Sequence, residues 1–275
     1  MKKQRMILSI LLVLFVLLFL LIIIFVIFDK NKIIKYDEYK INQINKYLTV
    51  NSMYYDGIQE SLKGNDYNID IVDLDYIEIN KMIASYVITN IVPNKEYGYD
   101  NCKDCYKYFS RDDSIRFYDV DVVEKIYNDI FDGIFKRIAQ DDIIGFNILY
   151  YNEDIDKYYI NTVINDIKPK IISIYKDYIY EDDMLYIDYY YSNVGYGNDN
   201  NDSEKNNNEI SEKIYLYNIN DIMVKELMYS DLYDDDNVIS QYDNYIEYFD
   251  TIRYVFKYNK SSKKYLLTEV KLLEN

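Results

Sequence analysis

The sequence predicts an α+β protein: an N-terminal transmembrane helix, then two helices packed on a curved antiparallel sheet of about six to seven strands. Three observations predict it. A 23-residue apolar run opens the chain, two later segments repeat apolar residues every three or four positions, and after Asp141 the period changes to two. Helices first and strands afterwards favour the α+β class. An NTF2-like or cystatin-like fold is the nearest analogy, and fold analogy carries no function.

Residues 6–28 (MILSILLVLFVLLFLLIIIFVIF) contain one residue that is not apolar, Ser9. A helix of this length spans roughly 34 Å, enough to cross a hydrocarbon core of about 30 Å. A cleaved signal peptide would have a shorter apolar region followed by small residues, whereas this run ends in Asp29-Lys30-Asn31. The sequence therefore predicts one uncleaved transmembrane helix at 6–28, in contact with the lipid bilayer.

Three basic residues precede the apolar run and three follow it (Lys2, Lys3, Arg5; Lys30, Lys32, Lys35). The positive-inside rule compares these numbers, so it barely favours either orientation. The tail at 1–5 is short and basic, which suits the cytoplasm, and long C-terminal domains are translocated largely regardless of charge. We expect a single-pass cell-membrane protein with a cytoplasmic N-terminus and an extracytoplasmic C-terminal domain. A cytoplasmic domain is the alternative.

Behind the apolar run, residues 29–275 carry 47 acidic and 28 basic side chains (31 minus 3), a net charge of −19. Such a surface repels phosphate backbones, which excludes nucleic acid as a partner. It favours cations or basic proteins instead, and anionic lipid head groups fit only the basic cluster Lys30–Lys35. The 36 Tyr, with no Trp and no His, fit an AT-rich genome.

The chain divides into a tail at 1–5, the apolar run at 6–28, a stalk or irregular linker at 29–69, and a single acidic α+β domain at 70–275. In the linker, 29–50 has loosely helical apolar spacing and 51–68 is polar with two glycines. No Pro- or Gly-rich segment divides 70–275, and its polar stretch 197–209 predicts a long loop.

Two helices are expected in the domain. An apolar stripe predicts the first at about 75–92, with Asp73 or Asp75 as its cap and Pro93 ending it. The segment DVDVVEKIYNDIFD predicts the second from Asp121 to about Ile130, with Asp119 or Asp121 at its cap.

Strands are expected where β-branched and aromatic residues alternate with polar ones. We place a short extended stretch at 115–118 and seven strands at 143–151, 157–164, 170–180, 184–194, 212–219, 251–258 and 264–273. Turns at 152–154, 181–183 and 259–264 indicate hairpins. One face of each strand is apolar and the other mixed, as an antiparallel sheet with one covered face requires.

The spacing Cys102-Lys-Asp-Cys105 allows a small disulfide, two free thiols, or redox or metal chemistry. A thioredoxin-like site needs this pair at the start of a helix after a strand, whereas here it lies in a polar loop beside Asp100, Asp104 and Asp112. A zinc site would need carboxylates as its other two ligands. A local disulfide is the preferred reading.

Other chemistries find little support, and we expect no catalytic residue, no metal site and no cofactor. Without histidine, Ser/His/Asp and Cys/His catalysis lack their base. A carboxylate pair of the glycosidase type stays open, but acids are frequent, and those at 181–183 and 234–236 read as turns. No segment has the EF-hand pattern or a glycine-rich phosphate loop. The aromatic run 186–191 reads as the two faces of an ordinary strand.

The apolar N-terminus, the segment DVDVVEKIYNDIFD, the hairpin GFNILYYNEDIDKYYINTV and the terminal IRYVFKYNKSSKKYLLTEVKLL together resemble a set of uncharacterised single-pass, membrane-anchored proteins of AT-rich, low-GC bacteria. The resemblance implies an anchored extracytoplasmic α+β domain and supplies no activity.

These observations favour a non-enzymatic, membrane-anchored binding or interaction module. The alternative is a carboxylate-dependent enzyme acting on cell-envelope glycans, which would need two acids roughly 5–10 Å apart beside a groove. A third interpretation is a structural subunit of a membrane complex.

Overall fold

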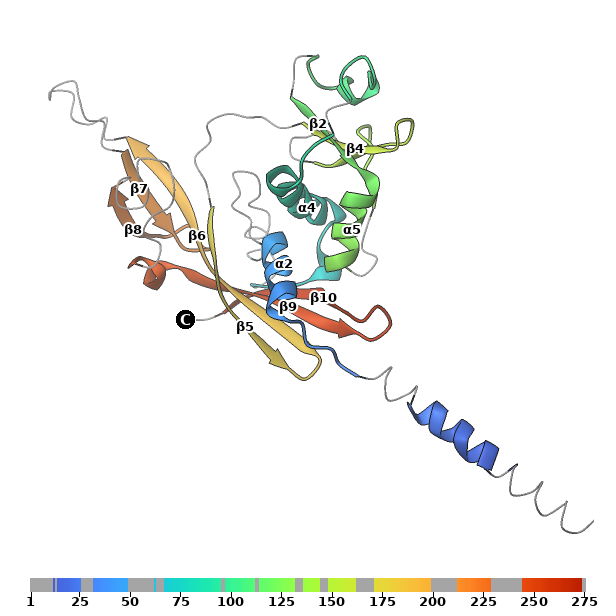
Figure 1. Cartoon of the computed structure of the whole chain (residues 1–275). Coiled ribbons are helices and arrows are strands. Elements are labelled where there is room, and N and C mark those ends of the chain that lie inside the picture. Colours follow the sequence, from blue (N-terminus) through green and yellow to red (C-terminus); the bar gives the residue numbers. More distant parts are fainter. Residues whose placement is uncertain are drawn as a thin grey trace, which may run out of the picture.

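The computed structural model describes residues 12, 14–25, 32–48, 62, 67–94, 97–111, 114–131, 136–143, 148–161, 171–198, 212–228 and 244–273. The α+β class is confirmed, because α-helices pack on antiparallel sheets (Figure 1). Within the described part of the domain, the α-helices with defined bounds are α2 (Glu38–Leu48), α4 (Tyr76–Asn90) and α5 (Val120–Ile130).

The larger sheet has seven antiparallel strands: β1 (Asn68–Asp70), β5 (Ile171–Glu181), β6 (Met184–Asn198), β7 (Glu212–Tyr217), β8 (Met223–Met228), β9 (Asp250–Asn259) and β10 (Lys264–Leu273). Their order is β1-β10-β9-β6-β7-β8, and β5 pairs with β6 outside this path. A smaller sheet has the order β2 (Ile115–Asp119), β4 (Lys157–Asn161), β3 (Tyr150–Asn152). The sequence predicted one sheet, whereas the described strands form two.

The long strand β6 pairs with three other strands. Along one edge it pairs with β5 from Met184 to Asn193; along the other it pairs first with β9 and then with β7. Asn193 marks the change, because it pairs with Ile171 of β5 on one side and Tyr217 of β7 on the other. The two halves of the large sheet therefore share one strand.

The main core lies between the two sheets. Its described members come from α2, α4 and α5, from the inner face of β6, β9 and β10, and from one face of the small sheet. Alternate residues of β6, such as Leu185, Ile187 and Tyr189, are buried there, as the period of two requires. A second cluster lies where β5, β6, β7 and β8 meet and includes Ile172, Leu216 and Leu227.

Both domain helices expected from the sequence form. In α4, Asp75 is the N-cap, and its side chain accepts a hydrogen bond from Ile77 N. The helix ends at Asn90, before Pro93. In α5 the N-cap is Asp119, without a side-chain capping bond. The caps are therefore Asp75 and Asp119 rather than Asp73 and Asp121.

The predicted strands 170–180, 184–194, 212–219, 251–258 and 264–273 correspond to β5, β6, β7, β9 and β10, and 115–118 to β2. In the first predicted hairpin, 150–152 and 157–161 are strands, whereas 144–147 and 162–164 lie outside the described residues. Two strands were not predicted: β1, in the segment expected to be irregular, and β8, in the segment 220–250.

The predicted stalk at 29–69 differs from the structure. Residues 38–48 form α2, and Ile41, Ile44 and Leu48 are buried in the main core. Since these three positions follow helical spacing, α2 buries one stripe against the sheet and α4. The folded domain therefore begins before residue 70.

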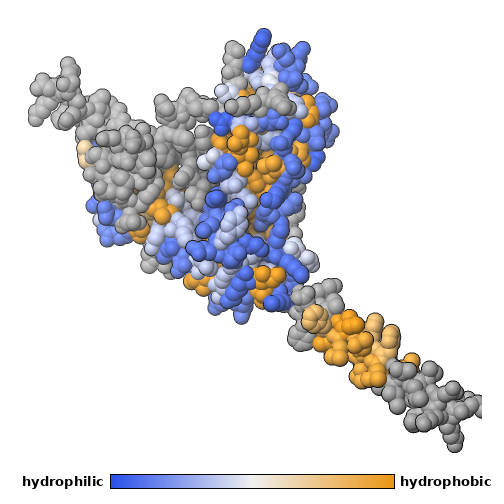
Figure 2. Space-filling model, viewed as in Figure 1, coloured by the Kyte–Doolittle hydropathy of each residue, from blue (hydrophilic) through white to orange (hydrophobic). Residues whose placement is uncertain are grey.

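Residues 14–25 of the expected membrane span are helical. Among the described residues, no helix combines the length and the apolar character needed to cross a membrane. The expected span 6–28 includes 6–11, 13 and 26–28, which lie outside the described residues, so the span stays a proposal. In Figure 2 the described part of the stretch is hydrophobic throughout, whereas the domain surface is mostly hydrophilic.

Candidate functional site

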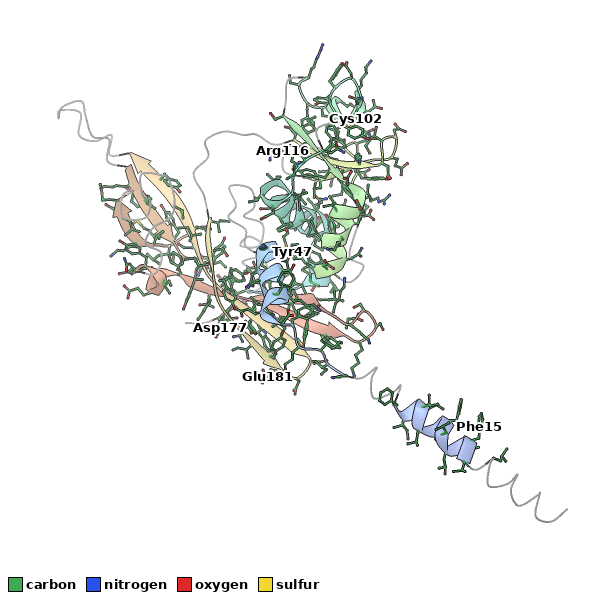
Figure 3. The ribbon with its side chains drawn as sticks, in the orientation of Figure 1. Phe15, Tyr47, Cys102, Arg116, Asp177 and Glu181 are labelled. Carbon is green, nitrogen blue, oxygen red and sulfur yellow. A yellow bond between two sulfur atoms is a disulfide. The ribbon has the colours of Figure 1, made fainter. Side chains whose placement is uncertain are left out.

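A groove lies between α2, α5 and the turn that joins β9 to β10. It has a volume of about 410 Å³, within the range of small-ligand sites. Its lining is aromatic and basic: Tyr36, Tyr39, Lys40, Gln43, Ile44, Tyr47, Lys125, Asp129, Ser262, Lys263 and Lys264. Figure 3 labels Tyr47 on α2, the helix that forms one wall.

The α2 wall is fixed by tyrosines of the sheet. Tyr180 Oη accepts a hydrogen bond from Tyr36 N at 2.9 Å, and Tyr36 Oη accepts one from Tyr265 N at 3.0 Å. Tyr189 Oη donates to Asn45 Oδ1 at 3.1 Å. Since each bond joins residues far apart in the sequence, the wall depends on the folded sheet.

The opposite wall is the β9–β10 turn. Asn259 Oδ1 accepts hydrogen bonds from Ser261 N at 2.9 Å and Ser262 N at 3.0 Å. Lys263 has φ 55°, the left-handed conformation that closes the turn before Lys264 starts β10. The turn therefore presents two consecutive lysines to the groove from a defined backbone.

Among the described residues that line the groove, Asp129 of α5 is the one carboxylate. Its Oδ1 lies 2.6 Å from Lys264 Nζ and its Oδ2 lies 3.9 Å from Lys125 Nζ. Lys40 Nζ lies 4.9 Å from the centroid of the Tyr36 ring, within cation–π range. Burial, and then the charge of Asp129, raise the pKa of Tyr47 to about 12, so this phenol is protonated at neutral pH and can donate a hydrogen bond.

The groove can attract an anion and hold an aromatic or aliphatic body. Its described lining residues include four lysines and one aspartate, a net charge of +3 (4 − 1). Among the described residues, no group of three or more His, Cys, Asp or Glu is placed to hold a metal ion.

Cys102 and Cys105 form a disulfide, with their Cα atoms 5.4 Å apart. Cys102 is 5 % exposed and Cys105 0 %. They pack against the outer face of the small sheet with Phe117, Tyr150 and Tyr159. The loop is thus polar in sequence, but its two sulfur atoms are buried. Figure 3 shows Cys102 at the end of the domain distant from Glu181, which lies at the β5–β6 turn.

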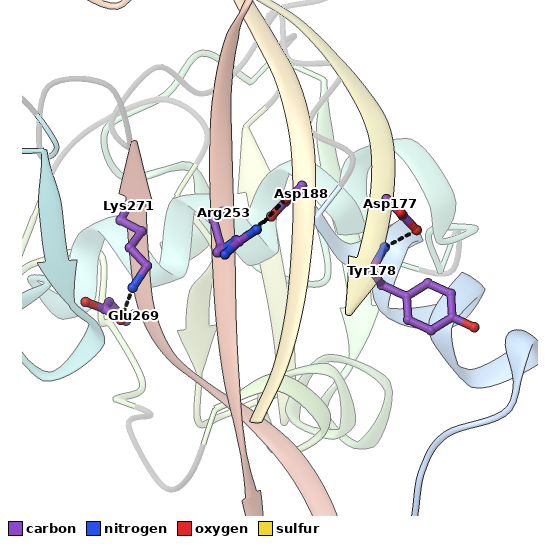
Figure 4. A network of polar contacts seen from close by, with 6 residues as sticks. All are labelled: Asp177, Tyr178, Asp188, Arg253, Glu269 and Lys271. Atoms are coloured by element: carbon purple, nitrogen blue, oxygen red, sulfur yellow. Dashed lines mark hydrogen bonds and ion pairs between the residues drawn. The ribbon is translucent and has the colours of Figure 1, made fainter. Parts of the chain in front are cut away.

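The aromatic run 186–191 forms part of β6, with its two faces as the strand period requires. Tyr189 and Tyr191 are buried in the core beside Ile187, whereas Asp188 lies on the opposite face. There Asp188 pairs across the strands with Arg253 of β9, at 2.7 and 2.8 Å (Figure 4). The same face carries the Glu269–Lys271 ion pair of β10.

The acidic turn at 181–183 is not part of the groove lining. Residues 181–183 form the β5–β6 turn, where Glu181 and Asp182 are exposed, whereas 234–236 and most of 197–209 lie outside the described residues. Burial raises the pKa of Asp250, but Asp250 accepts a hydrogen bond from Ile219 N at 2.6 Å and is not part of the lining.

No protein-family model matches the chain, and no curated protein or solved structure is significantly similar to it. The resemblance to bacterial single-pass proteins and the analogy to NTF2-like or cystatin-like folds therefore stay predictions.

The sequence did not indicate the groove, whose lysines come from three distant segments. One signal was available: Lys260, Lys263 and Lys264 in NKSSKK form a basic turn in an acidic chain.

Proposed function

We propose that this chain is a non-enzymatic binding module, held at the cell membrane by residues 6–28, with its domain on the extracytoplasmic side. The observation that carries the proposal is the groove: a preformed, cation-lined site of about 410 Å³ with three tyrosines and one carboxylate. Such a composition suits recognition of a ligand more than acid–base chemistry, which needs two groups with different proton affinities.

The exposure of the N-terminal apolar residues supports an anchor. The 13 described residues of the stretch, Leu12 and 14–25, are between 39 % and 75 % exposed. Large exposed apolar surfaces mark contacts with membranes or other proteins. The basic residues on either side of the stretch would lie at the lipid head groups.

The alternative, a glycan-acting enzyme with two carboxylates, finds less support. Such an enzyme places one acid on each side of its groove. Among the described residues of the lining, Asp129 is the single carboxylate, and it is engaged by Lys264 and Lys125.

The topology can be tested with a cysteine reporter in intact cells. Ser261 is exposed in the β9–β10 turn, so Ser261→Cys gives an accessible thiol, while the native cysteines are joined and buried. Gln4→Cys in the N-terminal tail is the matched control on the other side of the membrane. Cells are treated with a membrane-impermeant maleimide before and after lysis.

Labelling of Ser261→Cys in intact cells, together with labelling of Gln4→Cys only after lysis, is the expected result. The reverse pattern would mean a cytoplasmic domain. Labelling of both variants only after lysis, with the protein in the supernatant, would mean that residues 6–28 are not an anchor. Either of these results would overturn the proposal.

A further inference from the structure

We infer that the groove between α2, α5 and the β9–β10 turn binds a phosphate-bearing ligand through the ammonium groups of Lys40, Lys125, Lys263 and Lys264. This inference rests on the proposed function, because it names the ligand class of the same site.

The charge of the groove is opposite to that of the chain. The whole protein carries a net charge of −16, yet the described residues of the groove lining carry +3 (four lysines minus one aspartate). In an acidic chain, a cation-lined cleft concentrates anions at one place and repels them elsewhere. An anion is therefore attracted to the groove and repelled by the rest of the surface.

Two of the lysines are available to a ligand. Among the described residues, no carboxylate lies within ion-pair distance of Lys40 or Lys263, and both side chains are exposed. The other two share Asp129, whose oxygens lie 2.6 Å from Lys264 and 3.9 Å from Lys125. Asp129 thus pairs with Lys264 and Lys125, and the positive charges of Lys40 and Lys263 are left without a carboxylate partner among the described residues.

The donors suit phosphate better than carboxylate. The rigid fork of arginine suits carboxylate and phosphate alike, whereas lysine binds as a compact point charge with three donors. A phosphate monoester presents three terminal oxygens and about two negative charges at neutral pH, against two oxygens and one charge in a carboxylate, so several ammonium groups favour the phosphate. Among its described residues the lining has four lysines and no arginine. These lysines come from three elements, so they approach the groove from different sides. The Tyr47 hydroxyl, protonated at neutral pH, adds a neutral donor.

The site is organised before a ligand arrives. Asn259 fixes the turn through Ser261 N and Ser262 N, and the left-handed Lys263 sets the direction of the chain. Tyr36 is held on the other wall by Tyr180 and Tyr265. Preorganised donors lose less conformational entropy on binding. Tyr39 and Tyr47 also line the groove, and aromatic rings can contact the organic part of a phosphate ester.

The phosphate can belong to a lipid head group or to a soluble ester. Tyr36 of the groove is 11 residues (36 − 25) from Phe25, the end of the described apolar helix. An extended chain of that length covers at most roughly 40 Å. The groove therefore lies close enough to a bilayer to meet head groups, and also opens to soluble ligands.

The test uses the full chain in a neutral detergent. Calorimetric titration with glycerol 1-phosphate is compared with titration of acetate at equal ionic strength. A parallel experiment places the chain in nanodiscs of phosphatidylcholine with or without phosphatidylglycerol and counts the phosphatidylglycerol molecules that remain bound after detergent extraction, by native mass spectrometry.

The groove variant is Lys40→Gln with Lys263→Gln. The matched control is Lys257→Gln with Lys260→Gln, which removes two exposed charges of the β9–β10 hairpin outside the lining. We expect the groove variant to bind about tenfold more weakly or worse, because two charge-assisted contacts are lost. The control variant should bind as the wild type does.

A soluble ester as ligand would give saturable glycerol 1-phosphate binding that the groove variant loses. A head group would give retained phosphatidylglycerol, lost in the same variant, without binding of the free ester. Equal binding of phosphate and acetate, equal loss in both variants, or no binding in either experiment would overturn the inference. These outcomes are independent of the topology experiment, since the Ser261→Cys reporter depends on no groove lysine.

Discussion

Arg253 and Asp188 form a two-pronged ion pair across adjacent strands of the large sheet, on the face opposite the helices. Nε of Arg253 donates to Oδ1 at 2.7 Å and Nη2 donates to Oδ2 at 2.8 Å. Asp188 as a whole is 7 % exposed, and the Arg253 side chain 23 %. Among the ion pairs between described residues it is the most buried. The Tyr186 ring centroid lies 5.1 Å from the guanidinium.

Removing one partner of this pair leaves the other charge poorly solvated. We expect Asp188→Ala to lower the free energy of unfolding by about 2–4 kcal/mol, because it leaves the Arg253 charge partly buried without a partner. Lys271→Met, which breaks the more exposed pair with Glu269, should cost about 1 kcal/mol or less. Urea denaturation measures both changes.

The double variant Asp188→Leu with Arg253→Met separates pairing from packing. Since both charges are removed, most of the stability lost in Asp188→Ala should return. A double variant as unstable as Asp188→Ala would show that the residues matter for their shape rather than for their charge.

The Asn80 side chain connects α4 to the chain before β3. Its Nδ2 donates to Leu149 O at 2.9 Å and its Oδ1 accepts from Leu149 N at 2.9 Å, and Asn80 is 1 % exposed. Asn80→Ala should lower the free energy of unfolding by about 2–4 kcal/mol, because two buried backbone groups lose their partner. Asn90→Ala on the same helix, at an exposed position, should cost about 1 kcal/mol or less. Equal effects of the two variants would contradict this role.

The Cys102–Cys105 disulfide closes a short loop. Because only three positions separate the two residues, the loop entropy removed from the unfolded chain corresponds to about 2 kcal/mol. The double variant Cys102→Ala with Cys105→Ala should lose about that amount in guanidinium titrations without reductant. With reductant present during unfolding, the free energies of unfolding of the wild type and the variant should become similar. A variant as stable as the wild type under oxidising conditions would contradict this expectation.

Alkaline pH should destabilise the groove through Tyr47. Burial and Asp129 raise its pKa from 10.0 to about 12 in the folded state. Between pH 10 and 12 the unfolded chain gives up the Tyr47 proton more readily than the folded chain does. The contribution of Tyr47 to stability is therefore complete below pH 10 and is lost as the pH rises through about 12. The free energy of unfolding of Tyr47→Phe should therefore fall less steeply than that of the wild type between pH 10 and 12.

Tyr39→Phe is the control for the alkaline titration, because Tyr39 lies on the same helix with 70 % of its surface exposed. Its stability should follow that of the wild type over the same pH range. Parallel curves for Tyr47→Phe and Tyr39→Phe would show that burial of Tyr47 has no energetic effect.

The period of the apolar residues predicted most of the elements. In β9, Ile252, Tyr254 and Phe256 face the core, and their alternation can be read directly from the sequence. By contrast, β8 has one buried residue, Leu227, so no alternation marks it. The strand β1 has three residues, which is too short for a period to be seen.

Helix α2 shows where local patterns fail. Its helical spacing was visible, but its partners were not. Tyr180, Tyr189 and Tyr265, which fix it, follow it by more than a hundred residues, and no local pattern indicates such a contact. The groove depends on the same contacts. The sequence therefore shows that lysines are present in these segments but does not show that they line one groove.

The shared strand β6 links the folding of the two halves of the large sheet. Since β9 and β7 occupy successive parts of one edge of β6, a slip of one residue in its pairing with β5 would turn the side chains of both halves to the wrong face. Correct alignment of one half therefore restricts the other during folding. The main core and the second cluster, where β5, β6, β7 and β8 meet, bury different residues. Because β6 belongs to both, we expect them to form and to melt together.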